Sequence, residues 1–565
     1  MQKRRIPALL AGVMLVLAAC SGAGTTDESG APSGEAGESG APTTPAGEQV
    51  LRVDLGVEPP TLDPNQAEDS ASISVLRAIT RPLAYFDESL EVVPELAESW
   101  DISPDGTQVT FHLRDGLTYS NGDPIVAGDF VYSWKRLIDP RTAAPYSYVM
   151  ADVVGGEELL AVDTEETSEA DIETMLEAFG VSAPDDATFV VDLARPASYF
   201  PFIAALWVTA PVPQAWIESE AATEAENYVS SGPFKLTVWE HNARIVLERN
   251  ENWYGEPPLL ERIDMAMIAD PAASLAAYEA DELDTQVPPS EEVPRLQDDP
   301  DLSQQIITGD ALSIYYMGFD LKDPEAPTAR SKALRYALSQ SVDKEALVAI
   351  AFSGVGTAAD SVVPPGMPGH QADIGLHYDL EAAQASMAAA LDELGLSDPS
   401  EISLEIGYNT DSNHEAKVEF LQEQWRTNLG IDVQLVGLEW GAYLDRLDTD
   451  PFDVFRLGWG ADYPHPNNFL TDLFTCTSGN NNMGYCNEDY DALLAEANAL
   501  PTLDEQLPLY AEAQELLLED APMLPLRFGQ AFYLAKPWVQ GLAPTAQDSQ
   551  NVGDQFYELV SIADH

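Results

Sequence analysis

The stretch that decides the fold is Leu96 to Pro140, LAESWDISPDGTQVTFHLRDGLTYSNGDPIVAGDFVYSWKRLIDP. Its segment Pro104–Gly106 has the composition of a tight turn. Val109, Phe111 and Leu113 follow this turn and alternate with polar residues, which places them on one face of a strand. The pattern predicts a β-hairpin with one buried face.

Helix and strand patterns alternate in the rest of the chain. Strand patterns lie at residues 50–58, 244–254 and 431–440, and helix patterns lie at 274–284, at 333–352 as one long helix, and at 416–430. Gly430 is expected to end the last of these helices. The alternation predicts an α/β fold with mostly open sheets, and no repeat of fixed period is present.

The chain is strongly acidic. Its 565 residues contain 27 Lys and Arg against 95 Asp and Glu, which gives a formal net charge of -68. A surface of this charge repels phosphate groups, which argues against nucleic-acid binding. Salt screens such repulsion, so we hypothesise a salt-tolerant or halophilic source, with a simply acidic exported protein as the alternative. Equal stability at about 0.1 M and about 2 M salt would contradict the halophilic hypothesis.

The N-terminus carries the features of an export signal. Basic residues at Lys3–Arg5 precede an apolar run that is too short to span a bilayer, so residues 1–19 are predicted to be a signal peptide. The run ends in LAAC, and this motif resembles the lipobox of bacterial lipoproteins. The resemblance implies that Cys20 is lipidated and anchors the protein to the outer face of the cytoplasmic membrane. An ordinary signal peptide that contains a cysteine is the alternative.

A tether is predicted to follow the anchor. Residues 20–49 consist of the lipidated cysteine and a stretch of Gly, Ser, Ala, Thr, Pro and Glu without apolar periodicity. A flexible coil of this length spans roughly 30 Å. Residues from about 50 onward therefore form the folded body, which contains enough apolar residues for two or more domains.

The folded body contains two cysteines, Cys476 and Cys486. Their short separation in an exported protein predicts a disulfide, with two free thiols as the alternative. The sequence contains no CxxC pair or Cys/His grouping of the kind that binds zinc. We therefore expect no metal site and no cofactor.

The sequence offers no motif for catalysis. A serine elbow of the form G-x-S-x-G does not occur. HEAKV at His414 lacks the second histidine of a zinc protease, and GVGTAA at Gly354 lacks the third glycine of a dinucleotide loop. We expect no enzyme activity. A hydrolase that uses two of the many carboxylates is the remaining enzymatic alternative.

The hairpin stretch resembles the family 5 extracellular solute-binding proteins of ABC importers, and in particular their oligopeptide-binding branch. The resemblance continues through GPFKLTVWEHNARIVLERNENWY, IGYNTDSN, LEWGAYLD, FDVFRLGWGADYPHPNNFL and KPWVQGL, and it covers nearly all of residues 50–565. It implies a two-lobed periplasmic-binding-protein-like clamp of type II with an extra subdomain. The implied parts are lobe I at 50–80, 213–312 and 530–565, an inserted subdomain at 81–212, and lobe II at 313–529.

The resemblance also implies a ligand site centred on Asp462. In the peptide-binding branch a carboxylate at this position meets the N-terminal ammonium of an extended peptide. The glycines Gly458 and Gly460 are expected to let the ligand backbone approach the strand. The other implied site residues are Glu68 near the start of the ligand, Tyr146 beside its backbone, Trp440 and Trp459 as pocket walls, and Arg456 and His414, which match groups that receive the carboxylate end in binders of longer peptides.

The sequence departs from this branch in two places. Gly318 stands where an acid often follows the first strand of lobe II, and LRFGQAFYL replaces a tyrosine-rich stretch before residue 536. Peptide length and side-chain preference therefore stay open. The resemblance implies a monomer that delivers peptides to an ABC permease. The alternatives are a nickel chelate, opine or oligosaccharide as the solute, and a peptide-sensing receptor as the function.

Overall fold

The computed structural model describes residues 48–219, 221–410 and 414–565. The predicted signal peptide, Cys20 and most of the tether lie outside these residues. Gln49, at the expected end of the tether, is buried, and its side-chain amide exchanges two hydrogen bonds of 2.9 Å with the backbone of Ile562. No helix in the described part of the chain combines the length and the apolar character needed to cross a bilayer.

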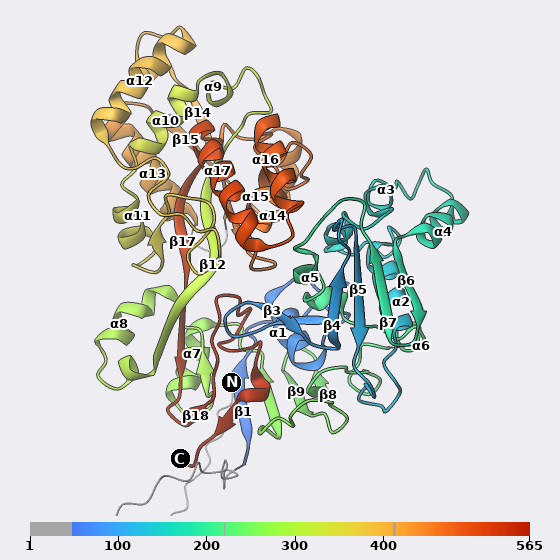
Figure 1. The fold of residues 1–565 in the computed structure, drawn as a ribbon. Helices are drawn as coiled ribbons and strands as arrows, with labels where there is room; N and C mark the ends of the chain where they lie inside the picture. The colour runs from blue at the N-terminus through green and yellow to red at the C-terminus, as the bar shows by residue number, and fades with distance from the viewer. Residues whose placement is uncertain (1–47, 220, 411–413) are drawn as a thin grey trace, which may run out of the picture. The chain divides into compact units, whose positions relative to one another are not determined.

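The strands form three larger sheets and two short pairs within the described residues (Figure 1). The first sheet has the order β1 (Val50–Asp54), β10 (Arg262–Ala266), β9 (Arg244–Arg249), β8 (Phe234–Glu240). The second has the order β4 (Ala97–Ile102), β5 (Gln108–Leu113), β7 (Thr188–Asp192), β6 (Val181–Asp185). The third has the order β11 (Thr285–Gln286), β17 (Met523–Ala535), β12 (Ile306–Phe319), β16 (Val454–Gly460), β14 (Leu404–Asn409), β15 (Val433–Leu438), with β13 (Thr357–Ala358) beside β17. The short pairs are β2 (Ala84–Phe86) with β3 (Val92–Pro94), and β18 (Val539–Gln540) with β19 (Ser561–Ile562).

Helices connect these strands. They are α1 (Ser70–Ile79), α2 (Ala127–Ile138), α3 (Gly156–Leu160), α4 (Glu169–Ala178), α5 (Phe200–Ile203), α6 (Gln214–Ile217), α7 (Pro271–Glu279), α8 (Val293–Asp298), α9 (Pro327–Arg330), α10 (Lys332–Gln340), α11 (Lys344–Ala351), α12 (Leu380–Leu394), α13 (His414–Leu429), α14 (Trp440–Thr449), α15 (Asn467–Phe474), α16 (Glu488–Asn498) and α17 (Leu503–Asp520).

The predicted hairpin is confirmed. Strands β4 and β5 are antiparallel, and Gly106 in the turn between them has φ +69°, in the left-handed region that favours glycine. Val109 and Phe111 are fully buried, and Phe111 packs near Phe189 of β7. The alternation in the sequence therefore identified the buried face correctly.

The prediction of one long helix over 333–352 is wrong. The structure has two helices, α10 and α11, separated at residues 341–343. Asp343 has an extended backbone, and its side chain accepts a hydrogen bond of 2.9 Å from the Ala346 N–H, so it caps the start of α11. The apolar spacing continues across the break because both helices pack on one core, to which Leu338 and Leu347 belong.

Other boundaries follow the predictions more closely. Helix α13 ends at Leu429, and Gly430 has φ +75°, which confirms it as the helix stop. The strand expected over 431–440 is shorter, because Glu439 caps a new helix that begins at Trp440.

Strands β12 and β17 connect two parts of the fold (Figure 1). One end of this long pair, with β11, packs on a small core that includes Tyr278 and Leu534. The other end lies beside β16 in the same sheet, where Ile314 and Tyr315 face separate cores on opposite sides. The register of the pair shifts between Asp310 and Ile314, so the ladder is interrupted between its two ends.

The predicted disulfide between Cys476 and Cys486 is confirmed. It lies between α15 and α16 and closes a loop with a sequence separation of 10 residues. The bridge restricts the segment that follows α15, the helix that begins immediately after the GWGADYPHP stretch.

Candidate ligand-binding site

Asp462 lies just beyond the end of β16 and contacts one distant segment of the chain and the nearby helix α15. Its Oδ1 accepts a hydrogen bond of 3.0 Å from the Tyr146 hydroxyl, and its Oδ2 accepts one of 2.9 Å from the Tyr148 hydroxyl. Asn468 donates a third bond of 2.9 Å to Oδ2 and accepts one of 2.9 Å from the Asp462 N–H. The carboxylate is therefore held in one orientation by three donors.

Local sequence explains how these groups meet. Tyr146 and Tyr148 flank Ser147 in a tight turn of 3-10 helix that spans Ser147–Met150, so both hydroxyls reach the same carboxylate. Tyr146 also packs edge-on against Trp207, with ring centroids 4.9 Å apart. Packing against Trp207 thus helps to hold Tyr146 beside Asp462.

The donors around Asp462 are all neutral. Burial raises the pKa of Asp462, and the hydrogen bonds from Asn468, Tyr148 and Tyr146 oppose this rise. No Lys, Arg or His of the described residues forms an ion pair with this carboxylate. A partly buried carboxylate with oriented neutral donors and no ion-pair partner among the described residues is suited to receive a cationic group.

Strand β16 has an open edge next to Asp462. It pairs with β12 along its whole length, but it pairs with β14 only at Val454 and Phe455. No other strand of the described residues pairs with 456–460 on the β14 side. The Ala461 N–H donates to Leu312 O of β12 at 2.7 Å. In an antiparallel pair the backbone N–H and C=O groups of successive residues point alternately toward and away from the partner strand. Every second residue before Ala461 therefore directs its backbone groups away from β12. These residues are Arg456, Gly458 and Gly460.

The two glycines leave this edge accessible. The Arg456 carbonyl already accepts a hydrogen bond of 2.7 Å from the Tyr443 hydroxyl. A Cβ atom on Gly460 would meet no atom within 4 Å, and one on Gly458 would lie 3.1 Å from Ile314 O. Gly458 and Gly460 therefore present backbone donors and acceptors on an unpaired edge, beside a carboxylate.

Arg456 and His414 lie on the Tyr315 face of the third sheet. The Arg456 Nη1 donates to Asn409 Oδ1 at 3.0 Å, and its guanidinium carbon lies 4.8 Å from the centre of the Tyr315 ring. His414 is buried, and its Nδ1 lies 3.2 Å from the Tyr315 hydroxyl. The two predicted carboxylate-end residues thus share one aromatic neighbour.

Two further cations lie close to this pair. Lys417 and Arg527 both lie over the Phe352 ring, at 5.1 and 4.8 Å from its centre. Burial and the charges of Arg456 and Arg527 lower the pKa of Lys417 to about 8. This end of the third sheet is therefore positively charged in a chain that is strongly acidic.

The remaining predicted residues lie in different surroundings. Trp459 is partly buried, and its indole N–H donates to Asn468 Oδ1 at 3.1 Å. Trp440 begins α14, is 41% exposed and stacks on Tyr443. Glu68 is exposed just before α1. The roles of all three in ligand binding stay predictions.

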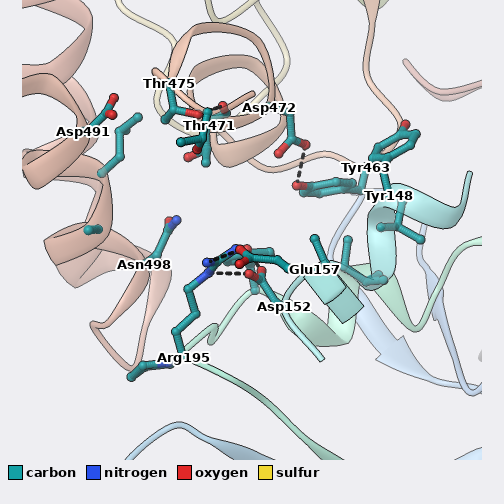
Figure 2. A pocket seen from close by; sticks show the side chains of 18 residues that line it. Tyr148, Asp152, Glu157, Arg195, Tyr463, Thr471, Asp472, Thr475, Asp491 and Asn498 are labelled. Atoms are coloured by element: carbon teal, nitrogen blue, oxygen red, sulfur yellow. Dashed lines mark hydrogen bonds and ion pairs between the residues drawn. The ribbon is translucent and has the colours of Figure 1, made fainter. Parts of the chain in front are cut away.

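A cavity of about 470 Å³ adjoins the contacts of Asp462 through Tyr148, and Figure 2 shows the side chains that line it. It is lined by Tyr148, Val149, Ala151, Asp152, Glu157, Arg195, Pro196, Tyr199, Ile203, Tyr463, Thr471, Asp472, Thr475, Thr477, Asp491, Leu494, Ala495 and Asn498. Tyr148 contributes both to this cavity and to the contacts of Asp462. The rings of Tyr199 and Tyr463 are stacked at 6.3 Å on one wall.

Three residues of this corner were not predicted from the sequence, namely Tyr148, Asn468 and Asp472. Tyr148 stands two residues after Tyr146, and this spacing was a usable signal. Asn468 and Asp472 are four residues apart on α15, which places them on one helix face. Nothing in the sequence shows that this face is turned toward Asp462.

Comparisons with known proteins agree on one family. The family described as "Bacterial extracellular solute-binding proteins, family 5 Middle" matches residues 91–481. The oligopeptide-binding protein OppA of Bacillus subtilis is 31% identical over 503 residues, which cover 87% of this chain and 88% of that protein. The probable deoxycholate-binding periplasmic protein YgiS of Escherichia coli is 29% identical over 500 residues, which cover 87% of this chain and 90% of that protein.

Solved structures show the same fold. Haemophilus influenzae OppA in complex with RPPGFSPFR has a TM-score of 0.73 at 28% identity, and the match covers 92% of this chain and 100% of that one. The unliganded open form of the murein tripeptide-binding protein MppA has a TM-score of 0.76 at 27% identity, and the match covers 92% of this chain and 99% of that one. The chain therefore belongs to the family 5 bacterial extracellular solute-binding proteins and has their two-lobed α/β clamp fold.

Proposed function

We propose that this protein captures peptides between its two lobes, with the peptide N-terminus at Asp462. The observation that carries the proposal is the juxtaposition of Asp462 with the open β16 edge at Gly458 and Gly460. An extended peptide can add to this edge as a strand through its main chain. Main-chain hydrogen bonds are the same for every side chain, so this mode supports broad specificity.

The peptide's other end is proposed to lie toward Arg456 and His414. Arg456 lies in β16 and Asp462 lies two residues beyond the end of this strand, so their six-residue separation spans at most about 20 Å at roughly 3.3 Å per residue. This separation sets an upper limit of about six extended ligand residues between the two charged ends. A guanidinium suits a carboxylate because it can donate two parallel hydrogen bonds.

The clamp is proposed to close around a hinge in the β12–β17 pair. The predicted lobe boundaries place the break at about residue 312 on β12 and about 530 on β17, and the register shift between Asp310 and Ile314 supports this location. By the same proposal, Cys20 carries a lipid anchor and the loaded protein delivers peptide to an ABC permease. No covalent chemistry is assigned to the chain.

A non-peptide solute is the second candidate, since one relative of similar identity is named for deoxycholate. The charge of the site opposes an anionic solute at this corner, because Asp462 forms no ion pair with a described Lys, Arg or His, and the nearby Arg77 is paired with Asp554 at 3.1 Å. Nickel chelates, opines and oligosaccharides remain alternatives within the family. A peptide-sensing receptor would need a signalling partner. A carboxylate-dependent hydrolase would release product over time.

Calorimetry with a panel of solutes tests the proposal. We expect trialanine or tetraalanine to bind to the purified protein, and we expect nickel–histidine, maltotriose and deoxycholate not to bind. An unchanged peptide recovered after binding would also argue against hydrolysis. Binding of one of the non-peptide solutes in place of both peptides would contradict the proposal.

A further inference from the structure

Asp462 shares a hydrogen-bond donor with a second carboxylate. Asn468 is fully buried, and its Nδ2 lies 2.9 Å from Asp462 Oδ2 and 3.0 Å from Asp472 Oδ2. Asp472 also accepts a hydrogen bond of 2.9 Å from the Tyr463 hydroxyl (Figure 2). One amide therefore bridges two acids, and each acid's other donors are neutral hydroxyls.

The described cations beside this pair already have acidic partners: Arg77, which lines a small pocket with Asp462, pairs with Asp554 at 3.1 Å. The charged and titratable groups around the pair come from several elements: Glu68, Arg77 of α1, Tyr146 and Tyr148 at the start of the 147–150 turn, Asp152, Glu157 of α3, Arg195, Tyr199, Tyr463, His465, Asp491 of α16 and Tyr510 of α17. Among the residues that the structure describes, Arg195 is the one Lys or Arg on the cavity wall, and it pairs with Asp152 at 2.5 Å and Glu157 at 2.8 Å. Burial lowers the pKa of His465 to about 3, so this histidine is neutral.

The hydrogen bonds to Asp462 and Asp472 differ in number, and this difference indicates which of the two carboxyl groups holds a proton. Asp462 accepts three side-chain donors, whereas Asp472 accepts two, and donors stabilise the ionised form. Burial, with the nearby charges of Asp462 and Asp152, raises the pKa of Asp472 to about 7. We therefore place the proton that exchanges near neutral pH on Asp472, because the additional hydrogen bond favours the ionised form of Asp462.

We propose that Asp472 releases its proton when a ligand ammonium reaches Asp462, so that capture of an ammonium ligand is coupled to proton release. Asn468 is the positioning residue that ties the two carboxylates together. This inference rests on the proposed function, because it needs a cationic group at Asp462.

The charge of the corner is the same before and after this exchange. Before binding, the Asp462 carboxylate and the protonated Asp472 carry a total charge of minus one. After binding, two carboxylates and one ammonium again carry minus one. The O–H bond of the Asp472 carboxyl breaks, and its proton passes to water through the cavity that Asp472 lines. A ligand without an ammonium supplies no charge to replace the proton, so it binds without release.

Calorimetry in buffers of different ionisation enthalpy measures the exchanged protons directly. With trialanine, the wild type is expected to release nearly one proton per peptide at about pH 6 and about half a proton at about pH 7, as a group of pKa near 7 does. Asp472→Asn is expected to bind trialanine with no release at either pH. The matched control is Asp491→Asn, which removes another carboxylate from the same cavity and should release protons as the wild type does.

Two measurements without ligand test whether Asp472 carries this proton. In a potentiometric titration, the wild type should bind one more proton than Asp472→Asn at about pH 5. This difference between the two titration curves should disappear as the pH rises, with a midpoint near pH 7. The pKa of this acid is raised, so its contribution to stability is full below about pH 4 and is lost as pH rises through about 7. Asp472→Asn should therefore raise the Tm more at about pH 8 than at about pH 5.

The outcomes separate this inference from the proposed function. Trialanine binding without proton release, or identical titration curves for the wild type and Asp472→Asn, would overturn the coupling and leave peptide capture intact. Failure of trialanine to bind would overturn both. If Asn468→Ala lowers affinity but keeps full proton release, Asn468 has a merely structural role, and its assignment as the link between the carboxylates is wrong.

Discussion

Replacing Asp462 by Asn is expected to weaken trialanine binding by roughly 30- to several-thousand-fold, a cost of about 2–5 kcal/mol. The substitution removes the charge that meets the ligand ammonium while keeping the side chain's shape. The hydroxyls of Tyr146 and Tyr148 can rotate to face an amide, so the fold should be retained. Calorimetry at a fixed pH measures the loss, and thermal unfolding shows whether the variant is folded.

N-acetylated trialanine provides the matched ligand for this test. Acetylation removes the ammonium, so the wild type should lose affinity to a similar extent. Because the two changes remove the same ion pair, acetylation should cost little in Asp462→Asn. If acetylation leaves the affinity of the wild type unchanged, Asp462 does not hold the peptide N-terminus.

Gly460→Pro is expected to weaken peptide binding by roughly 5- to 150-fold, or about 1–3 kcal/mol. The backbone N–H of Gly460 faces the open edge of β16, so proline removes a donor to the ligand without removing a bond to β12. The φ of Gly460 is not positive, and no atom lies within 4 Å of the position that a Cβ would take, so a side chain fits there. Calorimetry with trialanine measures the effect.

Gly460→Ala is the control for this substitution. It adds a Cβ but keeps the N–H, and the open space at this position predicts a small effect on stability. A loss in Gly460→Pro that exceeds the loss in Gly460→Ala identifies the main-chain hydrogen bond. Equal affinities for the wild type and Gly460→Pro would show that ligands do not pair with this edge.

The sequence predicted the local features of the fold well. Alternation over Val109–Leu113, the stop at Gly430 and the cysteine spacing each reflect chemistry within a few residues, and the structure confirms all three. The break between α10 and α11 was missed, although Asp343 is a standard capping residue. The continuous apolar spacing obscured it, because two helices on the same core show the same pattern as one.

The candidate site was less predictable because its partners are distant in sequence. Asp462 was found through its resemblance to a family motif, but its bond to Tyr148 joins residues 314 positions apart. The link from Asp462 through Asn468 to Asp472 depends on how α15 is rotated against β16. Such tertiary contacts leave no periodic signal in a single sequence.

The central claim is that this protein holds peptides between its lobes, and native mass spectrometry tests it most directly. The protein should be purified from its expression host without refolding, so that any trapped ligand is retained. We expect a mixed population of bound species whose masses and fragments are those of short peptides with free N-termini, and a much smaller bound fraction for Asp462→Asn. A single bound sugar, bile acid or metal chelate in the wild type would contradict the account.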